Sequence, residues 1–315
     1  MVGTLVIYES IHGFTTRIAN SLALILGPAR CCRTAEFQGD HDAYDTVVIC
    51  APVYSDIIDG PIRTFVSDNA DWLTTKKVVL VCTCLVESRA NEYLLPLSAV
   101  LGKSVVLQAA LGGELILHQL SNSDRDTFHQ FCGISGVGFR DYNLYKKHQF
   151  VNLVRDIHRI QGQGRKTMEK PLLSQHIDAF LSSHNTCTLA TGYDENIRAT
   201  PMEYTYMNKH IYFLSEGGEK FSNLLINPHV SVCVYDSYKN REELAGMQIT
   251  GIAQCVQLNC EEYFSVVNHQ EIKYEKIAAL PFTMHLIKIN IDKIEFLSAE
   301  FKKLGFDIKQ TFLYK

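Results

Sequence analysis

One short segment near the start of the chain carries residue types suited to holding a phosphate group. Residues 10–17 read Ser-Ile-His-Gly-Phe-Thr-Thr-Arg, with hydroxyls at Ser10, Thr15 and Thr16 and a glycine at Gly13. Backbone N–H groups and hydroxyls at the start of a helix form an anion-binding site. The same residues also suit an ordinary helix start, in which a Ser or Thr side chain accepts a backbone N–H. Both interpretations stay open on the motif alone.

Motifs for several other chemistries are missing. The sequence contains ten cysteines but no C-x-x-C pair, and it contains no H-E-x-x-H or G-x-S-x-G segment. Zinc-finger spacing, metalloprotease chemistry and serine-hydrolase chemistry therefore receive no support. The apolar run that follows the first residues is too short for a signal peptide. We expect a cytoplasmic protein with reduced thiols.

The elements around the segment predict where a ligand would bind. Short apolar runs at residues 5–8, 47–51, 78–82 and 105–109 are typical of strands buried on both faces. Helical spacing lies between them and again at residues 150–157. This alternation predicts an α/β doubly wound parallel sheet, in which ligands bind beyond the carboxyl ends of the strands. Residues 112–149 contain several glycines that interrupt helical patterns, and we interpret them as a functional insertion or a long loop.

The first half resembles the flavodoxins. Residues 10–16 are similar to the S/T-x-T-G-x-T phosphate loop of that family, and together with residues 47–54 they resemble the branch that includes menaquinone-linked protoporphyrinogen oxidase. The resemblance covers about residues 1–160, the first predicted domain, and implies bound FMN. It implies phosphate contacts from Ser10, His12, Gly13, Phe14, Thr15 and Thr16, with His12 in place of the usual Thr. It also implies that Pro52, Val53 and Tyr54 lie against the flavin ring. Residues 84–87 follow the next strand but lack the Gly-rich, aromatic pattern of electron-transfer flavodoxins.

The second half has a different pattern. A Gly- and charge-rich stretch at residues 161–172 predicts a linker, and from residue 173 to 315 most segments alternate apolar and polar residues, as strands do. Five or six such strands predict a small antiparallel barrel. Segments at 188–191, 198–202, 211–215, 220–224 and 227–231 resemble, in order and spacing, the pyridoxamine 5'-phosphate oxidase-type FMN-binding split barrel.

That second resemblance implies another FMN site. It implies that Lys220 is the main phosphate ligand, and that Arg198, Thr200 and Ser222 support it, while Pro201, Met202 and Ser215 lie near the ring. A split barrel completes this site across two chains, so the resemblance also implies a homodimer. Glu219 stands beside Lys220, where the family usually has a second basic residue.

The charge and histidine content indicate whether nucleic acid, a membrane or haem is an expected partner. Lys and Arg number 30 against 34 Asp and Glu, and no basic block marks a nucleic-acid surface. No apolar run approaches the length of a membrane span. Among the 12 histidines, His118 and His129 in the 112–149 segment are candidate haem ligands, whereas an exposed or capping role is the ordinary alternative.

These observations predict an FMN-dependent oxidoreductase that passes electrons between flavin and a small or planar acceptor. A flavin stores the electrons itself, so few catalytic side chains are needed. A haem- or tetrapyrrole-binding or trafficking protein built on flavin-binding folds is the alternative from another class. A flavodoxin fused to its own reductase-like partner is a third possibility and predicts two flavins per chain. The electron donor and acceptor stay open.

Overall fold

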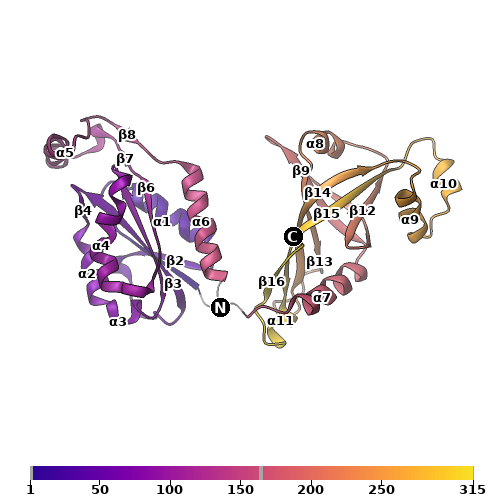
Figure 1. Cartoon of the computed structure of the whole chain (residues 1–315), viewed down its shortest axis with the longest axis horizontal. Coiled ribbons are helices and arrows are strands. Elements are labelled where there is room, and N and C mark those ends of the chain that lie inside the picture. The colour runs from indigo at the N-terminus through magenta and orange to yellow at the C-terminus, as the bar shows by residue number, and fades with distance from the viewer. Residues whose placement is uncertain (1–2, 163–165, 315) are drawn as a thin grey trace. The chain divides into compact units, whose positions relative to one another are not determined.

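The chain divides into two compact units, residues 1–164 and 165–315, and the computed structural model describes residues 3–162 and 166–314 (Figure 1). The predicted linker at 161–172 includes residues 163–165, which lie outside the described residues. On its two sides, α6 (Lys147–Gly162) is the last helix of the first unit and α7 (Lys170–Ser183) is the first helix of the second.

A parallel sheet forms the centre of the first unit. Its strand order is β2-β1-β3-β5-β6, which places the first three strands out of chain order, as in doubly wound sheets. The strands are β1 (Gly3–Tyr8), β2 (Ala29–Arg33), β3 (Tyr44–Tyr54), β5 (Lys77–Cys84) and β6 (Val105–Gly112). The short β4 (Ile57–Ile58) pairs with the end of β3. All four apolar runs that predicted strands lie in this sheet.

Helices cover both faces of the sheet and bury two separate cores. On one face, α1 (Phe14–Ile25) and α6 pack against strand residues such as Val6 and Val48. On the other face, α2 (Gly60–Asp68), α3 (Ala70–Leu73) and α4 (Ala90–Leu101) pack against neighbours such as Leu5 and Val47. Successive strand residues point to opposite faces, so each strand contributes to both cores.

An insertion leaves the sheet after β6 and returns before α6. It contains β7 (Glu114–Leu115), α5 (Asn122–Ser135) and β8 (Tyr142–Asn143), and β7 pairs with β8. At its base, Gly113 N–H donates to Cys84 O (2.7 Å) and Leu144 N–H donates to Gly113 O (3.0 Å). The glycines of the segment do not exclude a helix, because α5 contains Gly133 and ends before Gly136, which adopts a left-handed φ of 74°.

The second unit is a curled antiparallel sheet. Its order is β10-β9-β13-β14-β15-β12-β11, with β16 also paired to β15. The strands are β9 (Thr186–Tyr193), β10 (Asn196–Glu203), β11 (Thr205–Met207), β12 (His210–Ser215), β13 (His229–Tyr235), β14 (Ala245–Val256), β15 (His285–Ser298) and β16 (Lys309–Leu313). The helices are α7, α8 (Lys220–Ile226), α9 (Glu261–His269), α10 (Tyr274–Ala278) and α11 (Ala299–Lys303). The predicted fold class, a doubly wound sheet followed by an antiparallel split barrel, is confirmed.

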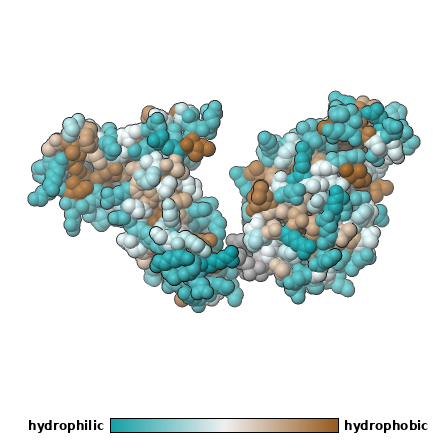
Figure 2. Space-filling model, turned by 180° about the vertical axis from the view of Figure 1, so that it is seen from behind, coloured by the Kyte–Doolittle hydropathy of each residue, from teal (hydrophilic) through white to brown (hydrophobic). Residues whose placement is uncertain are grey.

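The surface of both units is mostly hydrophilic, with scattered hydrophobic patches (Figure 2). Ile134 on α5 and Leu225 on α8 are among the most exposed large apolar side chains, at 89% and 88%. Across residues 3–162 and 166–314, every helix is too short or too polar to traverse a lipid bilayer.

Candidate functional site

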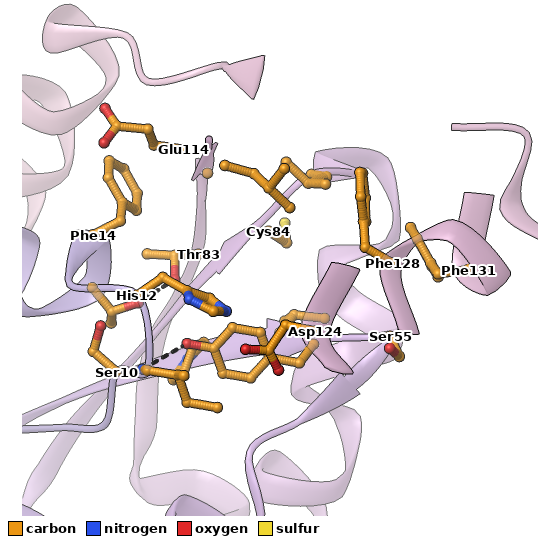
Figure 3. Close-up of a pocket in the computed structure, with 18 of the residues that line it drawn as sticks. Ser10, His12, Phe14, Ser55, Thr83, Cys84, Glu114, Asp124, Phe128 and Phe131 are labelled. Atoms are coloured by element: carbon orange, nitrogen blue, oxygen red, sulfur yellow. Dashed lines mark hydrogen bonds between the residues drawn. The ribbon is translucent and has the colours of Figure 1, made fainter. Parts of the chain in front are cut away.

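A pocket lies beyond the carboxyl ends of β1, β3 and β5, where a doubly wound sheet is expected to bind its ligand. Its walls come from the loop after β1, the turn after β3, the loop after β5 and the insertion (Figure 3). Of the site residues predicted in this unit, the pocket is lined by Ser10, His12, Phe14, Thr15, Pro52, Val53 and Tyr54. Gly13 and Thr16 belong to the same loop and are not among the lining residues.

The loop after β1 does not end in an ordinary side-chain cap. Helix α1 begins at Phe14 behind Gly13, which has a left-handed φ of 85°, and no side chain caps its first turn. Ser10 Oγ instead accepts the N–H of Gly13 within the loop (2.9 Å). The buried Thr15 hydroxyl pairs with that of Thr83 at the end of β5 (2.7 Å). The first-turn N–H groups of α1 therefore remain available to an anion.

Replacing Gly13 with valine should destabilise the first unit by about 1–2 kcal/mol and weaken anion binding by the loop. A Cβ at Gly13 meets no atom within 4 Å, so the cost arises from the left-handed backbone, which a β-branched residue rarely adopts. Urea unfolding followed by the fluorescence of Trp72 measures the stability. Gly60→Val is the matched control, because Gly60 also has open space but no positive φ. Equal losses in the two variants would contradict this explanation.

Tyr54 reaches from the end of β3 into the loop after β1. Its hydroxyl accepts the backbone N–H of Ile11 at 2.9 Å, and its ring meets His12 edge-on, with 5.7 Å between ring centroids. Burial raises the pKa of Tyr54, and the N–H groups of Ile11 and His12 and the Ser10 hydroxyl act in the opposite direction. The backbone N–H of Ile11 is therefore directed at the Tyr54 hydroxyl oxygen.

A strained turn follows Tyr54. Ser55 and Asp56 have left-handed φ values of 48° and 63°, although neither is glycine. Asp56 is held by two side chains from the loop and helix after β5: the hydroxyl of Tyr93 donates to its Oδ1 (2.6 Å), and Arg89 forms an ion pair with its Oδ2. Burial and the hydrogen bond to Asp56 raise the pKa of Tyr93. These contacts fix the turn that forms one wall of the pocket.

Cys84 at the end of β5, and Leu85 and Val86 in the loop that follows, line the pocket, although this segment lacks the pattern typical of flavodoxins. Cys84 Sγ faces the pocket in Figure 3, and the side chain is 3% exposed. A hydrogen bond with the Cys82 thiol lowers the pKa of Cys84. The thiolate of Cys84 is therefore favoured over that of Cys82, the other cysteine of this strand.

The insertion supplies a wall that the sequence did not identify residue by residue. Asp124, Phe128 and Phe131 project from α5 on the side of the pocket opposite Ser10 and His12 (Figure 3). The carboxylate of Asp124 accepts the Ser121 hydroxyl (2.7 Å), at the start of α5. The spacing of Asp124, Phe128 and Phe131, at i, i+4 and i+7, would have predicted a common helix face.

The predicted site residues of the second unit lie on β10, on the neighbouring helix α8 and at the end of β12. Arg198, Thr200, Pro201 and Met202 lie on β10, Ser215 ends β12, and Lys220 and Ser222 lie on α8. Lys220 is 8% exposed, and its Nζ donates to Gly217 O (2.5 Å). Burial lowers the pKa of Lys220, with Glu216 opposing this effect and Arg198 adding to it.

Two features of β10 and α8 affect how an anion would bind to Lys220. Thr200 Oγ1 is buried and has no hydrogen-bond partner among the described residues, so a polar group on β10 remains unsatisfied. Arg198 forms an ion pair with Glu219, which occupies part of its donor capacity. Ser222 is exposed, whereas Ser215 is buried with its Oγ 3.2 Å from Gly217 N.

The two candidate haem ligands do not line the pocket of the first unit. His118 follows β7 and His129 lies on α5, and both side chains are exposed. His129 contacts Phe139 edge-on. Within residues 3–162 and 166–314, no three His, Cys, Asp or Glu side chains are grouped so as to hold a metal ion. A haem role for these histidines stays a prediction.

Comparison with known proteins finds a separate match for each unit. Residues 5–134 match the family model described as flavodoxin domain, and residues 173–298 match that described as pyridoxamine 5'-phosphate oxidase. No curated protein sequence matches the chain.

Solved structures resemble parts of the chain. A putative pyridoxamine 5'-phosphate oxidase from Listeria innocua is 23% identical over 40% of this chain and 98% of its own, with a TM-score of 0.33. An FAD-binding protein from Mesorhizobium loti is 19% identical over 38% and 90%, with a TM-score of 0.32. A haem storage protein from Vibrio cholerae is 16% identical over 38% and 89%, with a TM-score of 0.33.

Proposed function

We propose that this chain, which joins a flavodoxin-like domain to a pyridoxamine 5'-phosphate oxidase-like flavin-binding fold, is an FMN-dependent oxidoreductase. In this proposal FMN binds in the pocket of the first unit and exchanges electrons with a small or planar partner. The loop of residues 10–16 holds the phosphate, and the walls beyond β3 and β5 hold the ring.

One observation carries the proposal: a single pocket combines a polar end and an apolar end. At the polar end, the first turn of α1 has no side-chain cap, so its backbone N–H groups suit a doubly charged phosphate. At the apolar end, Val53, Val86 and Phe128 supply flat or aliphatic surface for a planar ring. FMN has this division of polarity.

The residues of the pocket would position the cofactor rather than react. FMN itself supplies the electron storage when bound. Phe128 and Phe131 would exclude water from one side of the ring, and the turn held by Asp56 would fix the other wall. The Thr15–Thr83 hydrogen bond would hold the start of α1, which contacts the phosphate, at a fixed position relative to the end of β5, which contacts the ring.

We also propose a second FMN site in the split barrel, completed by a second copy of the chain. Support comes from a buried cation, Lys220 at the start of α8, and from the Thr200 hydroxyl on the neighbouring β10, which has no partner among the described residues. A buried ammonium that donates to a neutral carbonyl oxygen, that of Gly217, favours an anionic ligand. The site then requires two chains, and sedimentation with and without FMN tests this requirement.

The proposal is tested by titrating the purified full chain with FMN and following the quenching of flavin fluorescence. We expect saturable binding of one FMN per chain in the first unit, and of two if the barrel also binds. Absence of quenching at every protein concentration would refute the proposal. An absorption spectrum with a Soret band, lost on His118→Ala or His129→Ala, would instead favour the tetrapyrrole-binding alternative.

Alkylation of Cys84 should report occupancy of the first pocket. Cys84 lines the pocket but is 3% exposed, so iodoacetamide should modify it slowly when the pocket is empty, and saturating FMN should slow the reaction at least a further tenfold. Peptide mass spectrometry measures the modification. Cys255 is the internal control, because it is exposed in the other unit and should react equally with and without FMN. Unchanged labelling of Cys84 with FMN bound would place the flavin elsewhere.

A further inference from the structure

The hydroxyl of Tyr54 already occupies a donor of the predicted phosphate loop. The N–H of Ile11 points at this oxygen over 2.9 Å, and a second loop donor, the N–H of Gly13, is taken by Ser10 Oγ. A backbone N–H carries one hydrogen, so a strong bond to Tyr54 and an equal one to a phosphate oxygen exclude each other at Ile11.

The backbone around Tyr54 is fixed, so only its side chain is free to change position. Tyr54 pairs with Ile57 across the β3–β4 hairpin. The turn between them is held by the contacts of Asp56 with Tyr93 and Arg89. Rotation of the side chain about its χ1 bond would therefore release the hydroxyl without moving β3.

We infer that Tyr54 is an internal competitor of the phosphate group: its hydroxyl is a built-in ligand of the loop that must leave Ile11 before a phosphate oxygen can bind there. This inference rests on the proposed function, since it assigns a role to Tyr54 at the same site. It differs from a simple stacking role, in which the hydroxyl would contribute nothing or would help to bind the ligand. Tyr54 thereby lowers the affinity of the loop for every phosphate compound.

Tyr54→Phe separates these roles because it keeps the ring and removes only the hydroxyl. We expect the variant to bind FMN and inorganic phosphate about three- to tenfold more tightly than the wild type, which corresponds to one neutral hydrogen bond. Riboflavin, which has no phosphate, should bind both proteins equally. Titrations use the full chain carrying Lys220→Ala, so that the barrel site does not contribute.

Hydrogen exchange of the peptide that contains Ile11 gives a readout independent of flavin. Without ligand, its amides should exchange faster in Tyr54→Phe than in the wild type, and inorganic phosphate should protect them at lower concentration in the variant. Tyr145→Phe is the matched control. It removes a hydroxyl from a ring that packs against Phe14 and has no hydrogen bond to the loop among the described contacts, so its phosphate affinity should equal that of the wild type.

The outcomes distinguish this inference from the proposed function. If FMN binds the wild type but Tyr54→Phe binds FMN and phosphate equally or more weakly, the competitor role is wrong and the flavin site stands. If neither FMN nor phosphate binds either protein, both the flavin site and the competitor role are wrong. Tighter phosphate binding by the variant without any FMN binding would support the competitor role and refute the FMN assignment.

Discussion

Gly112→Ala is expected to destabilise the first unit by about 2–3 kcal/mol and to weaken FMN binding to its pocket at least tenfold. A Cβ on Gly112 would lie 2.2 Å from the carbonyl oxygen of Leu144 and 2.6 Å from its carbonyl carbon. Both are backbone atoms, so the clash is relieved only by moving the base of the insertion. Because the insertion carries Phe128 and Asp124 to the pocket, the displacement should open the ligand site.

Two measurements and one control test this result. Urea unfolding followed through Trp72, the only tryptophan, gives the free energy of unfolding of the first unit, and an FMN titration gives the affinity. Gly133→Ala is the control, because this glycine lies in α5, meets no atom within 4 Å and has no positive φ. Alanine should stabilise that helix slightly. A Gly112→Ala protein as stable as the control would show that the base of the insertion adapts freely.

Lys220→Ala should weaken FMN binding to the barrel by roughly 10- to 150-fold, the equivalent of about 1.5–3 kcal/mol for a hydrogen bond to a charged group. Lys220 is buried, and the proposal assigns its ammonium and the Thr200 hydroxyl, which has no partner among the described residues, to the phosphate. In a flavin titration, the second equivalent of FMN should disappear at micromolar concentration while the first remains. The pH dependence has a definite sign. Burial lowers the pKa of Lys220, so the charge and the affinity should decline at a lower pH than for an exposed lysine.

Lys239→Ala serves as the control for Lys220→Ala. Lys239 has a 72% exposed side chain paired with Glu243, so its removal should leave both FMN sites unchanged. If Lys220→Ala retains two equivalents with unaltered affinities, the barrel phosphate is held elsewhere. Lys220→Met separates charge from packing, because methionine retains most of the buried stem.

The sequence predicts the sheet of the first unit well because its central strands are buried on both faces. The apolar runs at residues 5–8, 47–51 and 78–82 lie on such strands, whereas the run at 105–109 lies on the edge strand β6 and is only partly buried. The edge strand β2, which reads Ala-Arg-Cys-Cys-Arg, escaped prediction because only Cys32 in it is buried. The sequence does not predict helix α5 because Gly133 interrupts its helical pattern. The structure shows that the helix tolerates this glycine.

The candidate site was predictable in part. The loop of residues 10–16 was identifiable from its hydroxyls and glycine, since local chemistry determines an anion site at a helix start. The position of the Tyr54 hydroxyl depends on a contact across 43 residues of chain, which no local pattern reports. The wall formed by α5 likewise depends on how the insertion folds back. Residues 112–149 were marked as an insertion, but the chemistry of Asp124 and Phe128 becomes visible only when α5 faces the pocket.

The ligand-facing residues of the first unit lie at the ends of its strands, and Phe14 and Cys84 belong both to a core and to the pocket. Most of the pocket is built from four connecting segments, while side chains such as Ile49 and Val48 fill the layers beneath them. Each connector is anchored to strands whose packing does not depend on its sequence. The unit is therefore suited to loop exchange. Replacing the loops after β3, β5 or β6 should alter ligand preference while the sheet and its two cores stay folded.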